Sequence, residues 1–167
     1  MSTGDHGALA AAAEAERAVL AANAALYDAF ESADLDLMEA VWLDGPQAAD
    51  VICVHPGWPA LRGRGPVLRS WAMIMANTSY ISFVLTDVDA TVDGDVAVVT
   101  CSENILTGMP EVAEPIPALA ATGLSGGRVA ATNVFRRTPT GWRLWVHHSS
   151  PVLSEDADPD GVEADDE

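Results

Sequence analysis

The chain has 167 residues, 49% of them hydrophobic, which is enough for one domain with a single core. Its 25 acidic residues outnumber its 8 basic ones, so the formal net charge is -17, and it contains no lysine. This balance excludes the basic surface that nucleic-acid binding requires, and we expect no nucleic-acid partner.

Membrane and secretory functions also lack support in the sequence. No apolar run approaches the roughly 20 residues needed to cross a bilayer, and "MSTGDHGA" has no basic region before an apolar one. Cys53 and Cys101 lie in separate apolar runs, and their spacing matches no zinc or redox motif. We therefore expect a cytoplasmic protein with reduced thiols and no membrane partner.

The two ends of the chain differ in composition from its middle. Residues 154–167 contain eight acidic and no basic residues, which predicts a disordered acidic tail. Residues 1–8 are expected to form a flexible N-terminus. One folded domain should therefore span residues 9–153.

Helical signals dominate the first half of the chain. Residues 9–32 are alanine-rich and free of glycine and proline, which predicts a helix. Asp34 is placed as the N-cap of a second helix ending near Leu43. A short strand, "DVICVHP", precedes a third helix over about 67–75, with Pro66 in its first turn.

Strand signals dominate the second half. Two long strands surround the Asp-Gly pair of "VDGDV", and two more surround "TPTG", so two antiparallel hairpins are predicted. Residues 108–127 connect them and contain three prolines with several apolar side chains. We expect this connection to cover the mouth of a pocket, as a lid.

These elements resemble a known family. The segments "VHPGWPALRGRGPVLRSW", "TCSENI" and "ATNVFRRTPTGWRLWVHHSSP" are similar to the SnoaL-like branch of the nuclear transport factor 2-like superfamily. The resemblance implies an α+β fold in which three N-terminal helices pack in a strongly curved antiparallel β-sheet, a cone with a pocket. It also implies a homodimer formed through the outer face of the sheet. Members include isomerases, dehydratases and polyketide cyclases as well as proteins that catalyse nothing, so the fold does not determine the function.

Strand alternation predicts which polar side chains face the pocket. In the last strand, His148 and Ser150 share a face with Trp142, Leu144 and Val146, which predicts that they point inward. His147 and Trp145 then face outward, toward a dimer partner. Asn133 is predicted to point inward in the preceding strand. Alternation is ambiguous in "VAVVTCSENI", where we take the face that carries Glu103 as the inner one.

The inward polar residues suggest acid/base chemistry. His148 and Glu103 are the candidate catalytic pair for proton transfer next to a carbonyl, with Asn133 holding the resulting oxyanion. The same residues could instead be buried polar groups that satisfy each other. The predicted pocket-binding residues are His55, Trp58, Trp71, Ser150 and Met109.

The function expected from these residues has two forms. One is a cofactor-free cyclase, isomerase or dehydratase acting on a small carbonyl compound in an apolar pocket. The other is a non-catalytic ligand-binding or dimerisation module. His55, His148 and Glu103 would match the ligands of an iron site, but they have no diagnostic spacing, so we expect no metal and no cofactor.

Overall fold

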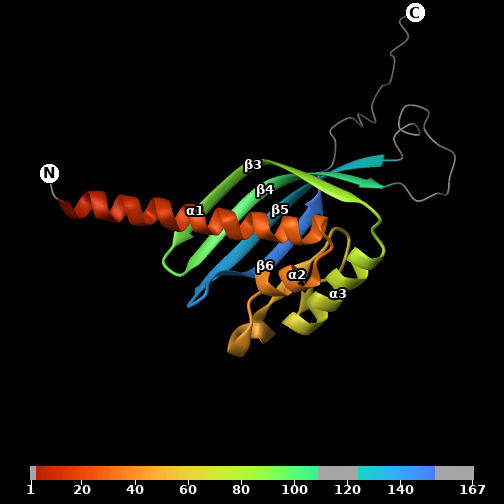
Figure 1. The fold of residues 1–167 in the computed structure, drawn as a ribbon, viewed down its shortest axis with the longest axis horizontal. Coiled ribbons are helices and arrows are strands. Elements are labelled where there is room, and N and C mark those ends of the chain that lie inside the picture. Colours follow the sequence, from red (N-terminus) through yellow and green to blue (C-terminus); the bar gives the residue numbers. More distant parts are fainter. Residues whose placement is uncertain (1–2, 109–123, 153–167) are drawn as a thin grey trace, which may run out of the picture.

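The computed structural model of the chain describes residues 3–108 and 124–152. Three α-helices, α1 (Thr3–Glu31), α2 (Leu35–Val41) and α3 (Arg64–Ala76), precede the long strands. Helix α1 begins before the predicted start at Leu9, and its N-terminal half extends beyond the edge of the sheet (Figure 1).

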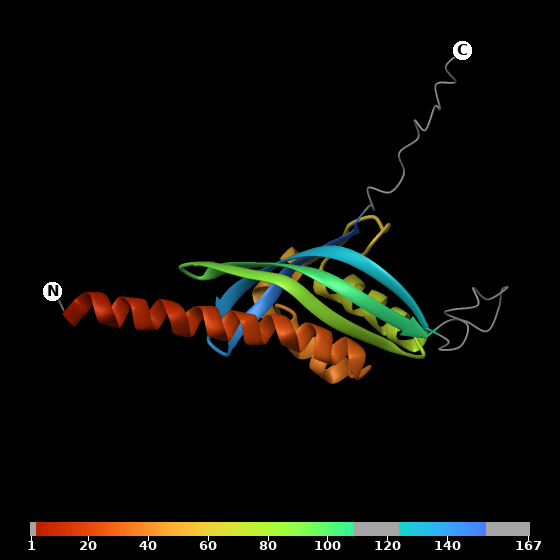
Figure 2. The same ribbon diagram turned by 90° about the horizontal axis from the view of Figure 1, so that it is seen from above.

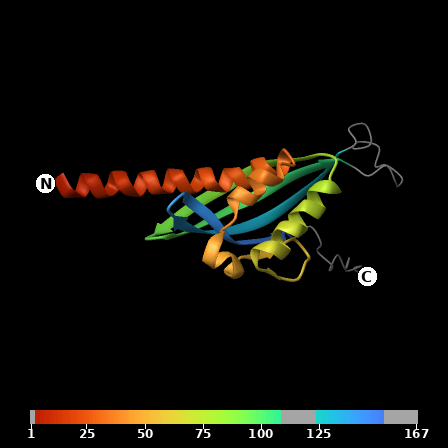
Figure 3. The ribbon, with the colours of Figure 1, turned by 60° about the horizontal axis from the view of Figure 1, so that its bottom comes forward.

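The strands form one six-stranded, unclosed sheet in the order β2-β1-β6-β5-β4-β3. Its strands are β1 (Ile52–Val54), β2 (Leu61–Arg62), β3 (Ile81–Asp93), β4 (Val96–Gly108), β5 (Leu124–Thr138) and β6 (Gly141–Pro151), and a 3-10 helix, η1 (Gly45–Asp50), precedes β1. Neighbouring strands are antiparallel except β1 and β6, which are parallel. The sheet bends around the helices on one face (Figures 2 and 3). The predicted α+β class is confirmed.

The core lies between the bent sheet and the helices. Its largest fully buried side chains come from α1, α2 and the segments after α2, together with β5 and β6: Leu26, Met38, Trp42, Leu43, Phe135 and Leu144. Full burial of one such apolar side chain stabilises the fold by about 1.5–3 kcal/mol. Between the helices and the sheet, this packing leaves a cavity that is lined in part by polar groups.

A β-bulge in β6 changes which residues face inward. Val134 of β5 pairs with Val146, whereas Phe135 pairs with Leu144, so Trp145 has no partner in the register. The extra residue shifts the alternation by one position. Trp142 and Leu144 face the core before the bulge, and His147 and Ser149 face it afterwards.

The predicted orientation of the two histidines is therefore wrong. His147 is 3% exposed and points inward, while His148 and Ser150 are exposed on the outer face. Trp145 does lie toward the outside, where the Arg136 guanidinium stacks on its ring at 3.6 Å and its indole N–H donates to the Asp50 carbonyl. A regular alternation cannot reveal an inserted residue, which explains the error.

The inner faces of the other two strands are as predicted. Ala97, Val99, Cys101 and Glu103 are buried in β4. Asn133 is fully buried in β5, on the same face as Phe135. Met109, most of the predicted lid and the acidic tail lie outside the described residues. Among the helices that are described, none is long and apolar enough to span a membrane.

Helix α2 has the N-cap that the sequence predicts. The Asp34 carboxylate accepts a hydrogen bond from the Leu37 N–H at 3.0 Å, and it also lies at the positive end of the helix dipole. We expect Asp34→Ala to lower the free energy of unfolding by about 1 kcal/mol, measured by urea denaturation. Asp44 precedes η1 and makes no side-chain cap bond, so Asp44→Ala is the matched control. Equal losses in both variants would contradict this role of Asp34.

Candidate active site

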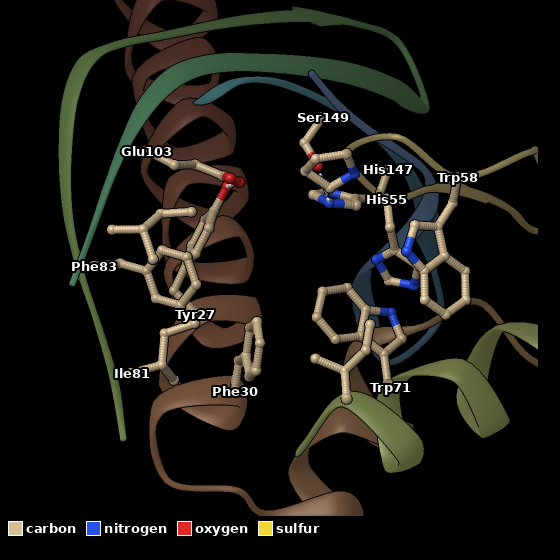
Figure 4. Close-up of a pocket in the computed structure, with 13 residues that line it drawn as sticks. Tyr27, Phe30, His55, Trp58, Trp71, Ile81, Phe83, Glu103, His147 and Ser149 are labelled. Atoms are coloured by element: carbon tan, nitrogen blue, oxygen red, sulfur yellow. Dashed lines mark hydrogen bonds between the residues drawn. The ribbon is translucent and has the colours of Figure 1, made fainter. Parts of the chain in front are cut away.

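A cavity of about 320 Å³ opens between the helices and the inner face of the sheet. Its walls combine aromatic and aliphatic side chains with a few polar groups (Figure 4). The lining residues are Tyr27, Phe30, His55, Pro56, Trp58, Trp71, Ile74, Ile81, Phe83, Glu103, Ile105, His147 and Ser149. A volume of this size suits a small organic ligand.

Glu103 and Tyr27 form the polar part of one wall. The Tyr27 hydroxyl donates to Glu103 Oε1 at 2.7 Å, and the two oxygens point toward the interior of the cavity (Figure 4). Burial raises the pKa of Glu103, and the hydrogen bond from Tyr27 opposes this only in part. Burial and the neighbouring Glu103 also raise the pKa of Tyr27, so its proton stays on the oxygen. Glu103 Oε2 is the carboxyl oxygen that Tyr27 leaves unused.

His147 lies on the facing wall, with its protonation set by its neighbours. Nδ1 lies 2.6 Å from Asn133 Oδ1, and an amide oxygen only accepts, so Nδ1 carries the hydrogen. The Ser149 hydroxyl, 3.3 Å from Nε2, then donates to this unprotonated nitrogen. Burial, with smaller contributions from His55 and His148, lowers the pKa of His147 to about 3. The ring is therefore neutral near pH 7.

His55 is a second neutral imidazole beside it, with ring centroids 6.5 Å apart. Nε2 lies 2.9 Å from Ser70 Oγ, and the single proton of Ser70 goes to the Val67 carbonyl at 2.7 Å. His55 Nε2 must therefore be the donor, which leaves a lone pair on Nδ1. Burial lowers the pKa of His55 to about 4. The rings of Trp58 and Trp71 contact it edge-on.

Asn133 connects the two walls from behind the cavity. It is 0% exposed and is absent from the cavity lining. Its Nδ2 donates to Asn23 Oδ1 at 2.8 Å and to the Tyr27 hydroxyl at 3.3 Å. A continuous set of hydrogen bonds thus runs from His147 through Asn133 and Tyr27 to Glu103.

Some residues predicted for the site are brought together and others are not. Glu103, His55, Trp58 and Trp71 line the cavity. His148 and Ser150 do not, because the bulge turns them outward, and their neighbours His147 and Ser149 take those places. Asn133 is too deep to hold an oxyanion of a ligand in the cavity as it stands.

Sequence reasoning missed Tyr27 as a functional residue. The available signal was its position four residues after Asn23, on the buried and otherwise apolar side of the helix. Two polar groups at that spacing on a core-facing stripe must find partners inside the fold. Phe30, Ile74, Ile81, Phe83 and Ile105, which complete the apolar wall, carried no signal distinct from ordinary core residues.

Within residues 3–108 and 124–152, no group of three or more histidine, cysteine, aspartate or glutamate side chains could hold a metal ion. His55, His148 and Glu103, the set that would match iron ligands, do not lie together, because His148 is on the outer face.

The fold and its cavity define a cone-shaped α+β protein of the nuclear transport factor 2-like class. The SnoaL-like domain family matches residues 19–154, and the chain belongs to that family. A comparison with curated proteins found no match.

Solved structures show the same relationship. A Streptomyces avermitilis protein described as a "putative dehydratase from the NTF2-like family" is 49% identical, with a TM-score of 0.74, and the match covers 86% of this chain and 99% of that one. A Thiobacillus denitrificans protein described as a "putative calcium/calmodulin-dependent protein kinase type II association domain" is 31% identical, with a TM-score of 0.63, covering 80% and 94%. A Novosphingobium aromaticivorans protein with a cystatin-like fold, 17% identical with a TM-score of 0.68 and covering 93% of each chain, shows the fold alone.

The buried neutral histidines should make the fold sensitive to mild acid. The folded-state pKa of His147, about 3, lies below its ordinary value of 6.5, so the unfolded chain binds a proton first as the pH falls. The free energy of unfolding should therefore decrease between about pH 6.5 and pH 4, by up to about 1.4 kcal/mol per pH unit for each such histidine. Urea denaturation at several pH values measures this slope.

His147→Gln should reduce the slope, whatever its effect on stability at neutral pH, because it removes one of the two groups. His148→Gln is the matched control, since His148 is exposed on the outer face of the same strand. An unchanged slope in His147→Gln would rule out a neutral, buried His147.

Proposed function

We propose that the protein is a cofactor-free acid/base enzyme that removes water from a small hydroxy-carbonyl compound. The observation that carries this proposal is the placement of Glu103 and His147 on opposite walls of one apolar cavity (Figure 4). Burial favours the neutral form of each, and these forms have complementary roles. A neutral carboxylic acid donates a proton, whereas a neutral imidazole accepts one.

The reaction uses one proton transfer at each wall. The Ser149 hydroxyl turns away from His147 Nε2, and this nitrogen removes a proton from the carbon next to the carbonyl. The released electron pair forms a C=C bond with the adjacent carbon. The C–O bond to the hydroxyl on that carbon breaks, and the proton on Glu103 Oε2 joins the leaving oxygen to give water. Transfer of the proton from His147 to Glu103 through solvent restores both neutral groups.

The surroundings support the charges that this reaction creates. The Tyr27 O–H on Oε1 stabilises the new carboxylate of Glu103, and that carboxylate in turn favours the imidazolium of His147. Phe30, Phe83 and the two tryptophans supply apolar contact area for the rest of the molecule.

The Streptomyces avermitilis relative supports this choice among acid/base reactions. It is 49% identical over nearly its whole length and is described as a dehydratase of this fold class. The polar groups of the cavity are those that an elimination needs, a base and an acid in one apolar space. A cytoplasmic setting is part of the proposal, since Cys53 and Cys101 are both free thiols.

Turnover should depend on both walls of the cavity. With a panel of small β-hydroxy ketones, dehydration gives a conjugated enone whose ultraviolet absorbance can be followed directly. We expect Glu103→Gln and His147→Gln each to lower kcat by about 10²–10⁴, the usual contribution of a positioned acid or base. His148→Gln should retain activity within about threefold because His148 does not line the cavity.

Thermal-shift measurements with the same compounds separate binding from chemistry. A wild-type protein that neither binds nor dehydrates any member of the panel would overturn the proposal. Loss of activity in His148→Gln equal to that in His147→Gln would overturn the assignment of the base.

A second candidate function is an association module, and the outer face of the sheet favours it. Val84, Val98 and Leu106 are exposed there, at 58%, 36% and 43%. The Thiobacillus denitrificans relative, 31% identical, is described as an association domain. We propose that this face forms a homodimer, as predicted from the sequence. An enzyme of this fold can also be a dimer, so the two functions are compatible.

Sedimentation velocity tests the dimer. Val98→Asp would place an unpaired charge in each half of a symmetric interface, at a cost of several kcal/mol. We expect the variant to sediment as a monomer at concentrations where the wild type is a dimer. Thr140→Asp, in the exposed turn between β5 and β6, is the control and should leave the dimer intact. A wild type that stays monomeric at high concentration would contradict the proposal.

A further inference from the structure

Asn133 occupies an unusual position for a polar side chain. It is 0% exposed, it lies directly opposite His147 in the β5–β6 register, and its amide makes three side-chain hydrogen bonds. The amide oxygen takes the bond from His147 and the amide nitrogen supplies the bonds to Asn23 and Tyr27. Asn133 is not among the residues that line the cavity.

We propose that Asn133 is a positioning residue that holds His147 in the Nδ1–H tautomer and Tyr27 with its proton directed at Glu103. This inference rests on the proposed function, but the protonation pattern that it predicts for His147 and Tyr27 can be measured without turnover. Asn133 acts through the two residues it contacts and does not touch the substrate. It therefore has a different role from the oxyanion-binding one that the sequence suggested.

The partners of Asn133 determine the direction of each hydrogen bond. Because Asn133 Oδ1 can only accept, the 2.6 Å contact requires a hydrogen on His147 Nδ1 and leaves the lone pair on Nε2. Because Asn133 Nδ2 already donates to the Tyr27 oxygen at 3.3 Å, the single Tyr27 proton is free to go to Glu103. Asn23 Oδ1, 2.8 Å from Nδ2, keeps the amide in this orientation.

Reversing the amide would reverse both effects. Its nitrogen would then face His147 Nδ1, which would have to accept, and the ring hydrogen would move to Nε2. Its oxygen would face Asn23 Oδ1, where two acceptors repel each other, and it would draw the Tyr27 proton away from Glu103. The orientation of one amide therefore decides whether His147 can act as a base.

The choice of asparagine over aspartate has a direct consequence. A carboxylate at the same distance from Nδ1 would stabilise the imidazolium and keep a proton on His147. The neutral amide orients the ring without holding the charge. The titratable groups around His147 are His55 from the loop after β1, His148 on the outer face of β6, and Tyr27 and Glu103 through Asn133.

The test is the tautomer of His147, measured in the whole protein by two-bond ¹H–¹⁵N NMR of the imidazole at pH 7, with His147→Gln to identify its signals. Free imidazole side chains favour the Nε2–H form, so a His147 with hydrogen on Nδ1 and a lone pair on Nε2 is the expected result. A His147 found as the Nε2–H tautomer in the wild type would overturn the proposal, whether or not any variant folds.

Asn133→Asp provides the second arm because it preserves the shape of the side chain and adds one charge. We expect it to raise the pKa of His147 by more than about 1, so that the ring titrates closer to neutral pH. Asn104→Asp makes the same change on the outer face of β4 and should leave His147 unaffected. An unchanged titration of His147 in a folded Asn133→Asp variant would also overturn the proposal. Failure of the dehydratase assay alone would leave this result standing.

Discussion

The β-bulge at Trp145 is the constraint on which the site depends. It inserts one residue between the part of β6 that packs in the core and the part that reaches the cavity, and so it turns His147 rather than His148 inward. A buried imidazole needs hydrogen-bond partners, and Asn133, directly opposite in the register, supplies one. The bulge and the asparagine therefore act together, the first placing the ring and the second orienting it.

The cavity contains few polar groups, and its mostly apolar walls shift the pKa values of those groups. Mostly apolar walls raise the pKa of Glu103 and lower the pKa values of His55 and His147 by the same physical effect, the cost of burying a charge. Groups of opposite type are thereby driven toward the same neutral state. An acid and a base that burial shifts toward their neutral forms can exchange protons with a substrate, which is the basis of the proposed elimination.

The inner and outer faces of the same strands differ in their surroundings. In β4, Glu103 faces the cavity, whereas Val98 and Leu106 are exposed on the other side. A strand with alternating side chains can therefore contribute to a reaction site and to an interface at once.

The sequence by itself determined the α-helices and the long strands of this protein, because helix caps, hairpin turns and apolar periodicity are local signals. Asp34, the Asp-Gly turn at 93–94 and the inner faces holding Glu103 and Asn133 were all predicted correctly. Only the tertiary structure decided which histidine faces the cavity and that Tyr27 joins Glu103 to Asn133. A bulge depends on the register between two strands, and the contact between Tyr27 and Glu103 joins residues far apart in the chain, so neither leaves a periodic pattern in either segment.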